Sequence, residues 1–118
     1  MVHALCNRAV TRLRQRDPAG AVEDCDRAIA ADPRCAVAHF TRGYIRQEQG
    51  RIDDAISDYT RVIEIDPGQE DAWGNRGDIY WAYGKRDLAA ADYRESLKVA
   101  PPEWPARKVK EQRLREVE

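Results

Sequence analysis

Proline recurs at a fixed interval along this chain, at Pro33, Pro67 and Pro101, each 34 residues after the one before. Aligning the sequence on these prolines needs no gap and brings other residues into register. Three aligned columns each hold one residue type: Arg8, Arg42 and Arg76; Ala21, Ala55 and Ala89; and Asp24, Asp58 and Asp92. A fixed period of about 20–50 residues is typical of repeat architectures, in which similar units stack on one another. We therefore expect three copies of one structural unit.

Each unit is predicted to form two helices. In the second unit, small and apolar residues recur at helical spacing over residues 36–49, and Gly50 follows as the residue that ends the helix. A second helix is predicted from Ile52 to Ile65, because the proline after Asp66 pushes that residue out of the helical region. No segment alternates apolar and polar residues as a strand does. The chain is therefore predicted to be all-α.

Small residues are expected where the two helices of a unit meet. Helix axes approach to about 8 Å only where the side chains between them are small. We expect Gly43 to face the region of Ala55, and Gly77 to face that of Ala89. One helix pair cannot bury its apolar face alone, so the units must stack, and about three are needed for a stable array.

The aligned residues resemble the tetratricopeptide repeat family. The positions that carry the repeat are Ala9, Ala21, Pro33, Gly43, Ala55, Tyr59, Pro67, Trp73, Gly77, Tyr80, Ala89, Tyr93 and Pro101. Arg12 and Arg46 stand where the family has tyrosine. The resemblance implies three antiparallel helix hairpins, residues 2–35, 36–69 and 70–103, wound into an all-α, right-handed superhelix.

Residues 104–118 follow the third unit and are mostly charged. Their apolar residues form a stripe of Ala106, Val109, Leu114 and Val117. Pro105 suits the start of a helix. We predict a capping helix that covers the exposed end of the array, with Trp104 docked on the last repeat. The alternative is a disordered charged tail.

The resemblance to the family implies a concave face, lined by the first helix of each repeat, that binds a segment of a partner protein. The residues predicted to bind a peptide there are Asn7, Phe40, Thr41, Tyr44, Asn75, Asp78 and Trp81. Phe40, Tyr44 and Trp81 form an apolar groove if they are exposed; the alternative is that they pack as ordinary core. The amides of Asn7 and Asn75 are able to bond the backbone of a bound peptide without reading its sequence.

One subclass of the family grips the C-terminal carboxylate of chaperones with Lys, Asn and Arg side chains at set positions. Here those positions hold Cys6, Val10, Thr41, Asp71 and Asn75. None of them carries a positive charge, and Asp71 would repel a carboxylate. Carboxylate-clamp binding of chaperone tails is therefore rejected for this segment, and the expected partner is another protein or peptide.

Charge separates the remaining classes of function. The chain has 20 Lys and Arg against 21 Asp and Glu, so it lacks the basic surface that nucleic acids and anionic membranes need. Residues 36–69 and 70–103 each carry a net charge of −2, which disfavours RNA binding by these repeats. Residues 2–35 and 104–118 carry +1 and +2, so self-assembly into oligomers through opposite ends is the main alternative to partner binding. No apolar run approaches the roughly 20 residues that a bilayer span requires.

Nothing in the sequence indicates catalysis. The only histidines are His3 and His39, and motifs for metal, phosphate or acyl-transfer chemistry are absent. We therefore expect neither an enzyme nor a bound cofactor or metal. Three cysteines without metal-ligand spacing indicate a reducing compartment, the cytoplasm. The arginine and aspartate columns are expected to pair within or between hairpins, and each pair is worth about 0–1 kcal/mol at a surface.

Overall fold

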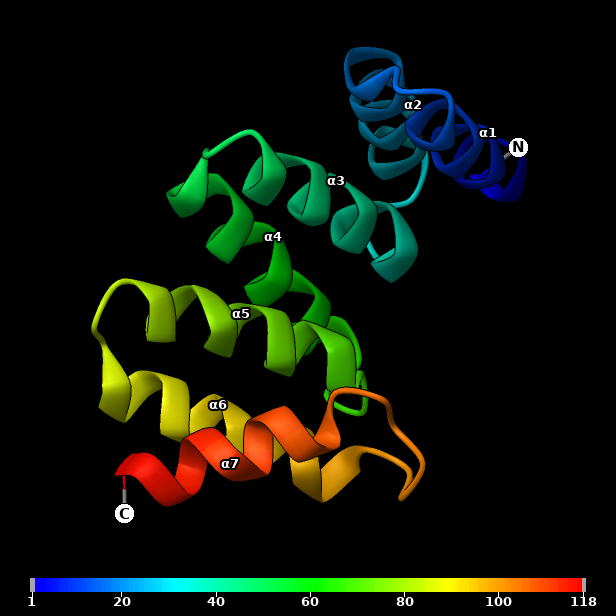
Figure 1. Cartoon of the computed structure of the whole chain (residues 1–118). Helices are drawn as coiled ribbons and strands as arrows, with labels where there is room; N and C mark the ends of the chain where they lie inside the picture. Colours follow the sequence, from blue (N-terminus) through cyan, green and yellow to red (C-terminus); the bar gives the residue numbers. More distant parts are fainter. Residues whose placement is uncertain (1, 118) are drawn as a thin grey trace. The chain divides into compact units, whose positions relative to one another are not determined.

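The computed structural model describes residues 2–117, which form α-helices joined by short turns, with no strand among them (Figure 1). These residues divide into two compact units, the first ending at Ile65 and the second beginning at Asp66. The first unit contains α1 (Val2–Arg14), α2 (Pro18–Ala31), α3 (Ala36–Glu48) and α4 (Ile52–Ile65). The second unit contains α5 (Glu70–Ala82), α6 (Arg86–Val99) and α7 (Arg107–Val117). The prediction of an all-α fold is confirmed.

Consecutive helices pair into hairpins, α1 with α2, α3 with α4, and α5 with α6 (Figure 1). Helix α4 has the predicted bounds, whereas α3 ends at Glu48, one residue earlier than predicted. Helix α7 packs on α6, so residues 107–117 are a helix and not a disordered tail. Glu118, the last residue of the predicted capping segment, lies outside the described residues.

The turns inside the hairpins share one backbone feature. Gly50 and Gly84 have φ angles of 79° and 76°, in a left-handed region that glycine reaches without steric cost. The corresponding residue of the first hairpin is Arg16, with a φ of 61°. A residue with a side chain is destabilised by about 1–2 kcal/mol in this region. The first turn therefore holds backbone strain that the other two avoid.

The two helices of each hairpin meet at small residues, as the sequence predicts. The fully buried alanines are Ala9, Ala21, Ala28, Ala55, Ala72 and Ala89. A Cβ atom added to Gly77 would lie 2.8 Å from the ring of Tyr93, closer than two non-bonded carbon atoms approach. The missing side chain at Gly77 therefore lets the ring of Tyr93 lie directly on the backbone of α5.

The glycines face a different part of the second helix from the predicted one. Gly43 is nearest to the side chains of Asp58 and Tyr59, and not to Ala55. Gly77 is likewise nearest to the side chains of Tyr93 and Asp92, and not to Ala89. The correction amounts to about one helical turn, and its cause is the tyrosine ring, which fills the space that a side chain on the first helix would occupy.

A buried aspartate ties each hairpin to an arginine of its first helix. The pairs and their shortest N–O distances are Arg8–Asp24 at 2.7 Å, Arg42–Asp58 at 2.8 Å and Arg76–Asp92 at 2.8 Å. The predicted pairing is therefore confirmed and lies within the hairpin. The expectation of a surface pair is wrong, because all three aspartates are 4% exposed or less. A buried carboxylate requires such a partner, since its desolvation is not otherwise offset.

The two arginines that replace the family's tyrosine reach the same buried carboxylates. Arg12 lies 3.5 Å from Asp24, and Arg46 lies 2.9 Å from Asp58. The departures from the family pattern thus supply a second cation to a buried charge. The hydrogen bonds from Arg8 lower the pKa of Asp24, and the positive charge of Arg12 acts in the same direction.

The first two hairpins stack through a shared core. Cys6 of α1 lies there with its Sγ atom 3.5 Å from the Sγ of Cys35, the residue that precedes α3. Cys25 is fully buried in the same core and serves as a small hydrophobe, and burial raises the pKa of its thiol to about 12. Arg42 of α3 also reaches back to Asp26 of α2, at 2.8 Å. The stacking therefore combines apolar packing with an ion pair between hairpins.

The buried alanine column gives a first prediction. Ala55→Leu should lower the free energy of unfolding by about 1–3 kcal/mol, because its added methylenes have no space at a fully buried position. Ala91→Leu, on the exposed side of α6, should stay within about 0.5 kcal/mol of the wild type. Urea denaturation followed by circular dichroism measures both. Wild-type stability of the Ala55→Leu variant would contradict the close approach of α3 and α4.

The buried aspartates give a second prediction. Asp58→Ala should cost about 3–5 kcal/mol, because it removes the shared partner of Arg42 and Arg46, whose side chains are only 17% and 18% exposed. Asp24→Ala is the matched variant and should cost less, because the side chain of Arg8 is 46% exposed and turns to water readily. Chemical denaturation of both variants measures the difference. A larger loss in Asp24→Ala would show that partner burial does not control the cost.

Candidate functional site

In the first unit, the first helices α1 and α3 carry the residues that the sequence predicts to bind a peptide. Asn7 is exposed on α1, and Tyr44 is 42% exposed on α3. Phe40 is half-buried, because its ring packs on that of Tyr59 with 5.6 Å between the centroids. Thr41 is buried and offers no side chain to a partner. The accessible part of the predicted site in this unit therefore centres on Tyr44, with Asn7 on the neighbouring helix.

A cavity of about 640 Å³ lies beside Tyr44, where the C-terminal ends of α1 and α3 come together. Its lining is formed by Leu13, Arg14, Arg16, Pro18, Tyr44, Ile45, Glu48 and Gln49. This volume is within the range of about 300–1,000 Å³ that is typical of ligand pockets. The arginines of this lining, Arg14 and Arg16, were not among the residues predicted from the sequence to bind a partner. The signal that points to one of them is the glycine column, in which Arg16 stands where the other repeats have Gly50 and Gly84.

In the second unit, the segment around α7 covers the first helix. Trp104 is buried, and its ring donates a hydrogen bond of 2.9 Å from Nε1 to the carboxylate of Asp71 on α5. A Cβ atom added to Gly74 would lie 3.0 Å from the ring of Trp104, so the glycine makes room for it. The predicted docking of Trp104 on the last repeat is therefore confirmed, and it occupies part of the α5 surface that the sequence assigns to a partner.

Asp78 is likewise engaged by the chain itself. Its carboxylate accepts hydrogen bonds from Nζ of Lys110 at 2.9 Å, from Arg113 at 2.8 Å and from the hydroxyl of Tyr93 at 2.7 Å. Burial and the hydrogen bond to Asp78 raise the pKa of Tyr93, so that hydroxyl stays a donor. The guanidinium of Arg113 also lies 5.3 Å from the ring of Trp81. Lys110 and Arg113 of α7 therefore pair with the carboxylate of Asp78, which was predicted to contact a bound peptide.

The remaining predicted residues of α5 are also in contact with their own unit. The ring of Trp81 lies 6.1 Å from that of Tyr93, and the guanidinium of Arg86 stacks 3.9 Å from it. Asn75 is half-buried and already has an interaction partner. We therefore leave Thr41, Asn75, Asp78 and Trp81 out of the surface proposed below.

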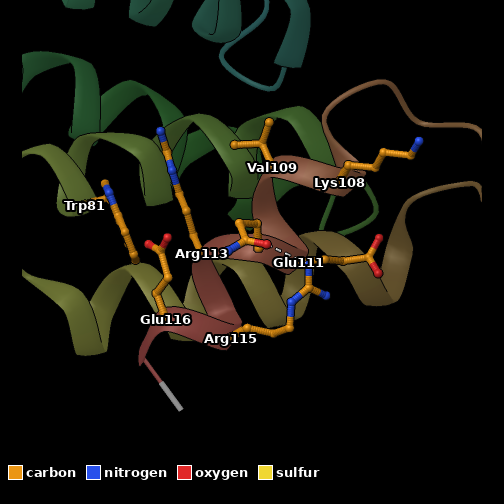
Figure 2. A pocket seen from close by; sticks show the side chains of 8 residues that line it. Trp81, Lys108, Val109, Glu111, Arg113, Arg115 and Glu116 are labelled. Atoms are coloured by element: carbon orange, nitrogen blue, oxygen red, sulfur yellow. Dashed lines mark hydrogen bonds between the residues drawn. The ribbon is translucent and has the colours of Figure 1, made fainter.

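A second cavity, of about 670 Å³, runs along α7 with Trp81 at one side. Figure 2 shows Arg113 and Glu116 extending from α7 on the side of Trp81. The side chains of Lys108, Glu111 and Arg115 complete a lining of mixed charge. Because cations and carboxylates are mixed along it, this cavity favours no ligand of one charge.

Residues 2–117 contain neither a cluster of metal-binding side chains nor a helix suited to crossing a membrane. No group of three or more His, Cys, Asp or Glu side chains in this range is placed to hold a metal ion. None of the helices in the same range combines the length and the apolar character that crossing a membrane requires.

Paired helices with a small-residue seam and a recurring buried ion pair define a helical-hairpin repeat protein. The tetratricopeptide repeat family matches residues 6–70 and, in an overlapping match, residues 40–105. The chain therefore belongs to the tetratricopeptide repeat family. A comparison with curated proteins gave no significant match.

Solved structures share this fold. The first tetratricopeptide domain of Spaghetti (RPAP3), bound to the HSP90 peptide SRMEEVD, is 19% identical with a TM-score of 0.86, over 98% of this chain and 92% of that one. The Arabidopsis OM64 domain is 24% identical with a TM-score of 0.87, over 99% and 96% of the two chains. The P58(IPK) domain is 26% identical with a TM-score of 0.90, over 98% of this chain but only 32% of that longer chain.

The docking of Trp104 gives a third prediction. Trp104→Ala should raise amide hydrogen exchange in α7 and along α5, because the ring that anchors this segment is lost, while exchange in α1–α4 stays unchanged. Val109→Ala is the control, since Val109 is 48% exposed on α7. Exchange read by mass spectrometry measures both. Unchanged protection of α7 in Trp104→Ala would show that the tryptophan does not hold this helix.

Proposed function

We propose that this chain is a non-catalytic protein-interaction module, and that the α1 and α3 side of its first unit binds an extended segment or a helix of a partner protein. The observation that carries the proposal is the exposed ring of Tyr44 beside a cavity of about 640 Å³. Exposed aromatic side chains beside pockets are the usual anchors of peptide and protein interfaces. The family membership supports a binding role, because the repeat is typical of interaction modules.

The partner is not expected to be a chaperone tail. A structural neighbour holds an HSP90 peptide, but this chain has no cation at the positions that would clamp a terminal carboxylate. In addition, Thr41 is buried, and Asp71 is a carboxylate that already accepts the hydrogen bond from Trp104, so neither supplies the cation that a clamp needs. These contacts support the sequence-based rejection of a carboxylate clamp.

Self-assembly through opposite charges receives less support. Lys110 and Arg113 of α7 are bound to Asp78, and Arg107 donates hydrogen bonds to the carbonyl groups of Leu97 and Ala100. Three of the five cations that were expected to attract another copy are therefore held by contacts inside the second unit. A cytoplasmic location remains our proposal, and it fits three cysteines that are all free thiols, two of them buried.

The proposal gives a fourth prediction. Peptides selected against the intact chain from a phage-displayed library should bind Tyr44→Ala at least about tenfold more weakly, a loss that corresponds to about 1.4 kcal/mol. The matched control is Tyr83→Ala, because Tyr83 is 61% exposed at the end of α5 in the other unit. Fluorescence anisotropy with labelled peptides measures the affinities.

The two tyrosine variants decide between surfaces. Equal affinity of wild type and Tyr44→Ala, or a matching loss in Tyr83→Ala, would contradict binding at α1 and α3. Circular dichroism of both variants checks that the helices are intact, and Tyr44 is exposed enough that its truncation should leave the fold unchanged.

A further inference from the structure

We infer that the cavity at the ends of α1 and α3 selects an apolar side chain that is followed or preceded by a side-chain carboxylate, within an acidic peptide segment. This inference rests on the proposed function, since it names the kind of segment that the first unit binds. Three independent features of the cavity support it: its apolar floor, the unpaired arginines at its rim and the backbone conformation of one of them.

The apolar part of the cavity accounts for the anchor residue. Leu13 and Pro18 are half-buried and contribute aliphatic surface beside the exposed ring of Tyr44, whereas Ile45 in the same lining is buried in the core. An aliphatic or aromatic side chain entering this space removes apolar area from water on both partners. If the entering side chain is aromatic, its ring also packs against the ring of Tyr44 in the offset arrangement that pairs of aromatic rings favour. The volume of about 640 Å³ leaves room for part of a neighbouring residue.

The arginines of the cavity lining account for the preference for a side-chain carboxylate in the ligand. Within residues 2–65, Arg14, Arg16 and Arg34 have no carboxylate in ion-pair contact, and the first two lie at this cavity. Each of the remaining arginines of this unit does form an ion pair with a carboxylate: Arg8, Arg12, Arg27, Arg42, Arg46, Arg51 and Arg61. Arg14 and Arg16 thus offer two unused guanidinium groups, which bind carboxylates with charge-assisted hydrogen bonds.

The backbone at Arg16 points to the same use of its side chain. The other two repeats place glycine at this turn, whereas Arg16 holds a φ of 61° at the edge of the cavity. Glycine would relieve the strain without changing the turn, since the hydrogen bond from N of Asp17 to the carbonyl of Arg12 has the same length, 2.8 Å, as its counterparts in the other hairpins. Strained residues gather at binding sites, where the side chain has a role that offsets the strain.

The cavity differs in position from a clamp for chain ends. Arg14 is the last residue of α1 and Arg16 lies in the turn that follows, and both line the cavity together with Glu48, the last residue of α3. Glu48 would repel a carboxylate placed on the α3 side, so the ligand carboxylate is directed to the α1 side. We then expect the apolar side chain of the ligand to lie between the α1 side and the α3 side of the cavity, against the ring of Tyr44. The arrangement therefore fits an internal acidic residue next to an apolar one.

The test uses three short synthetic peptides and the full chain. The first has a phenylalanine between aspartates, the second has asparagines in place of the aspartates, and the third has alanine in place of the phenylalanine. Binding is followed by two-dimensional amide NMR of the isotope-labelled protein. We expect the first peptide to shift amides at the ends of α1 and α3, and to bind about tenfold more tightly than either of the others.

Three variants separate charge from turn geometry. Arg16→Gly should raise the midpoint of thermal unfolding, because it relieves the left-handed strain, and should still weaken binding of the aspartate peptide. Arg14→Gln combined with Arg16→Gln should bind the aspartate and asparagine peptides equally. Arg34→Gln is the control, because Arg34 is also unpaired but lies outside the cavity, and it should bind as the wild type does.

The outcomes distinguish this inference from the proposed function. Selected peptides that depend on Tyr44 but show no preference for acidic residues would overturn the inference and leave the proposed function intact. Equal binding of the aspartate and asparagine peptides by the wild type, or no shift with any of the three, would also overturn it. Tighter binding of a short single-stranded RNA at the same amides would assign the arginines to phosphate groups and contradict it as well.

Discussion

The structure of every hairpin depends on one buried carboxylate. Asp24, Asp58 and Asp92 are each removed from water, and each is held by the arginine that lies 16 residues earlier, on the first helix. Because a buried carboxylate is costly without that partner, only one rotation and register of the two helices satisfies it. Replacing such pairs with apolar residues often leaves stability unchanged, so we expect their main effect to be on which helix faces pair. The small residues then follow, since this register brings Gly43 and Gly77 against tyrosine rings.

The arginine column of the repeat also explains why the two units differ in the surface that they leave open to a partner. Lys110 lies 34 residues after Arg76 and so occupies the position of the hairpin arginines on α7. It is buried like their aspartates, but its carboxylate comes from Asp78 on α5. With Trp104 on Asp71, this contact covers part of the surface of α5 with the chain's own C-terminal segment. In the first unit no helix plays this part among the described residues, and Tyr44 remains exposed.

Much of the fold is predictable from the sequence because the repeat is exact in length. The period defines the helix pairs, the alanine seam and the arginine–aspartate pairs without any knowledge of packing angles. It does not define how each helix is rotated, so the contact of Gly43 was placed one turn away and Thr41 was assigned to an open surface although it is buried. The hydrogen bonds from Lys110 and Arg113 to Asp78 do not follow the repeat and join residues more than 30 positions apart, and the cavity at Arg14 and Arg16 is likewise formed by the ends of separate helices.

The balance of hydrogen bonds indicates which unit a partner engages more readily. A ligand that approached Asp78 would have to displace hydrogen bonds from Lys110, Arg113 and Tyr93, two of them between opposite charges. Such bonds are about twice as strong as those between neutral groups, so their loss would offset most of what a new contact contributes. A carboxylate that approached Arg14 and Arg16 would displace no carboxylate of the chain from them, although Glu48 in the same lining would repel it, and an apolar side chain beside Tyr44 would add burial. The unpaired arginines at the ends of α1 and α3 therefore support our proposal that a partner binds there and not at Asp78.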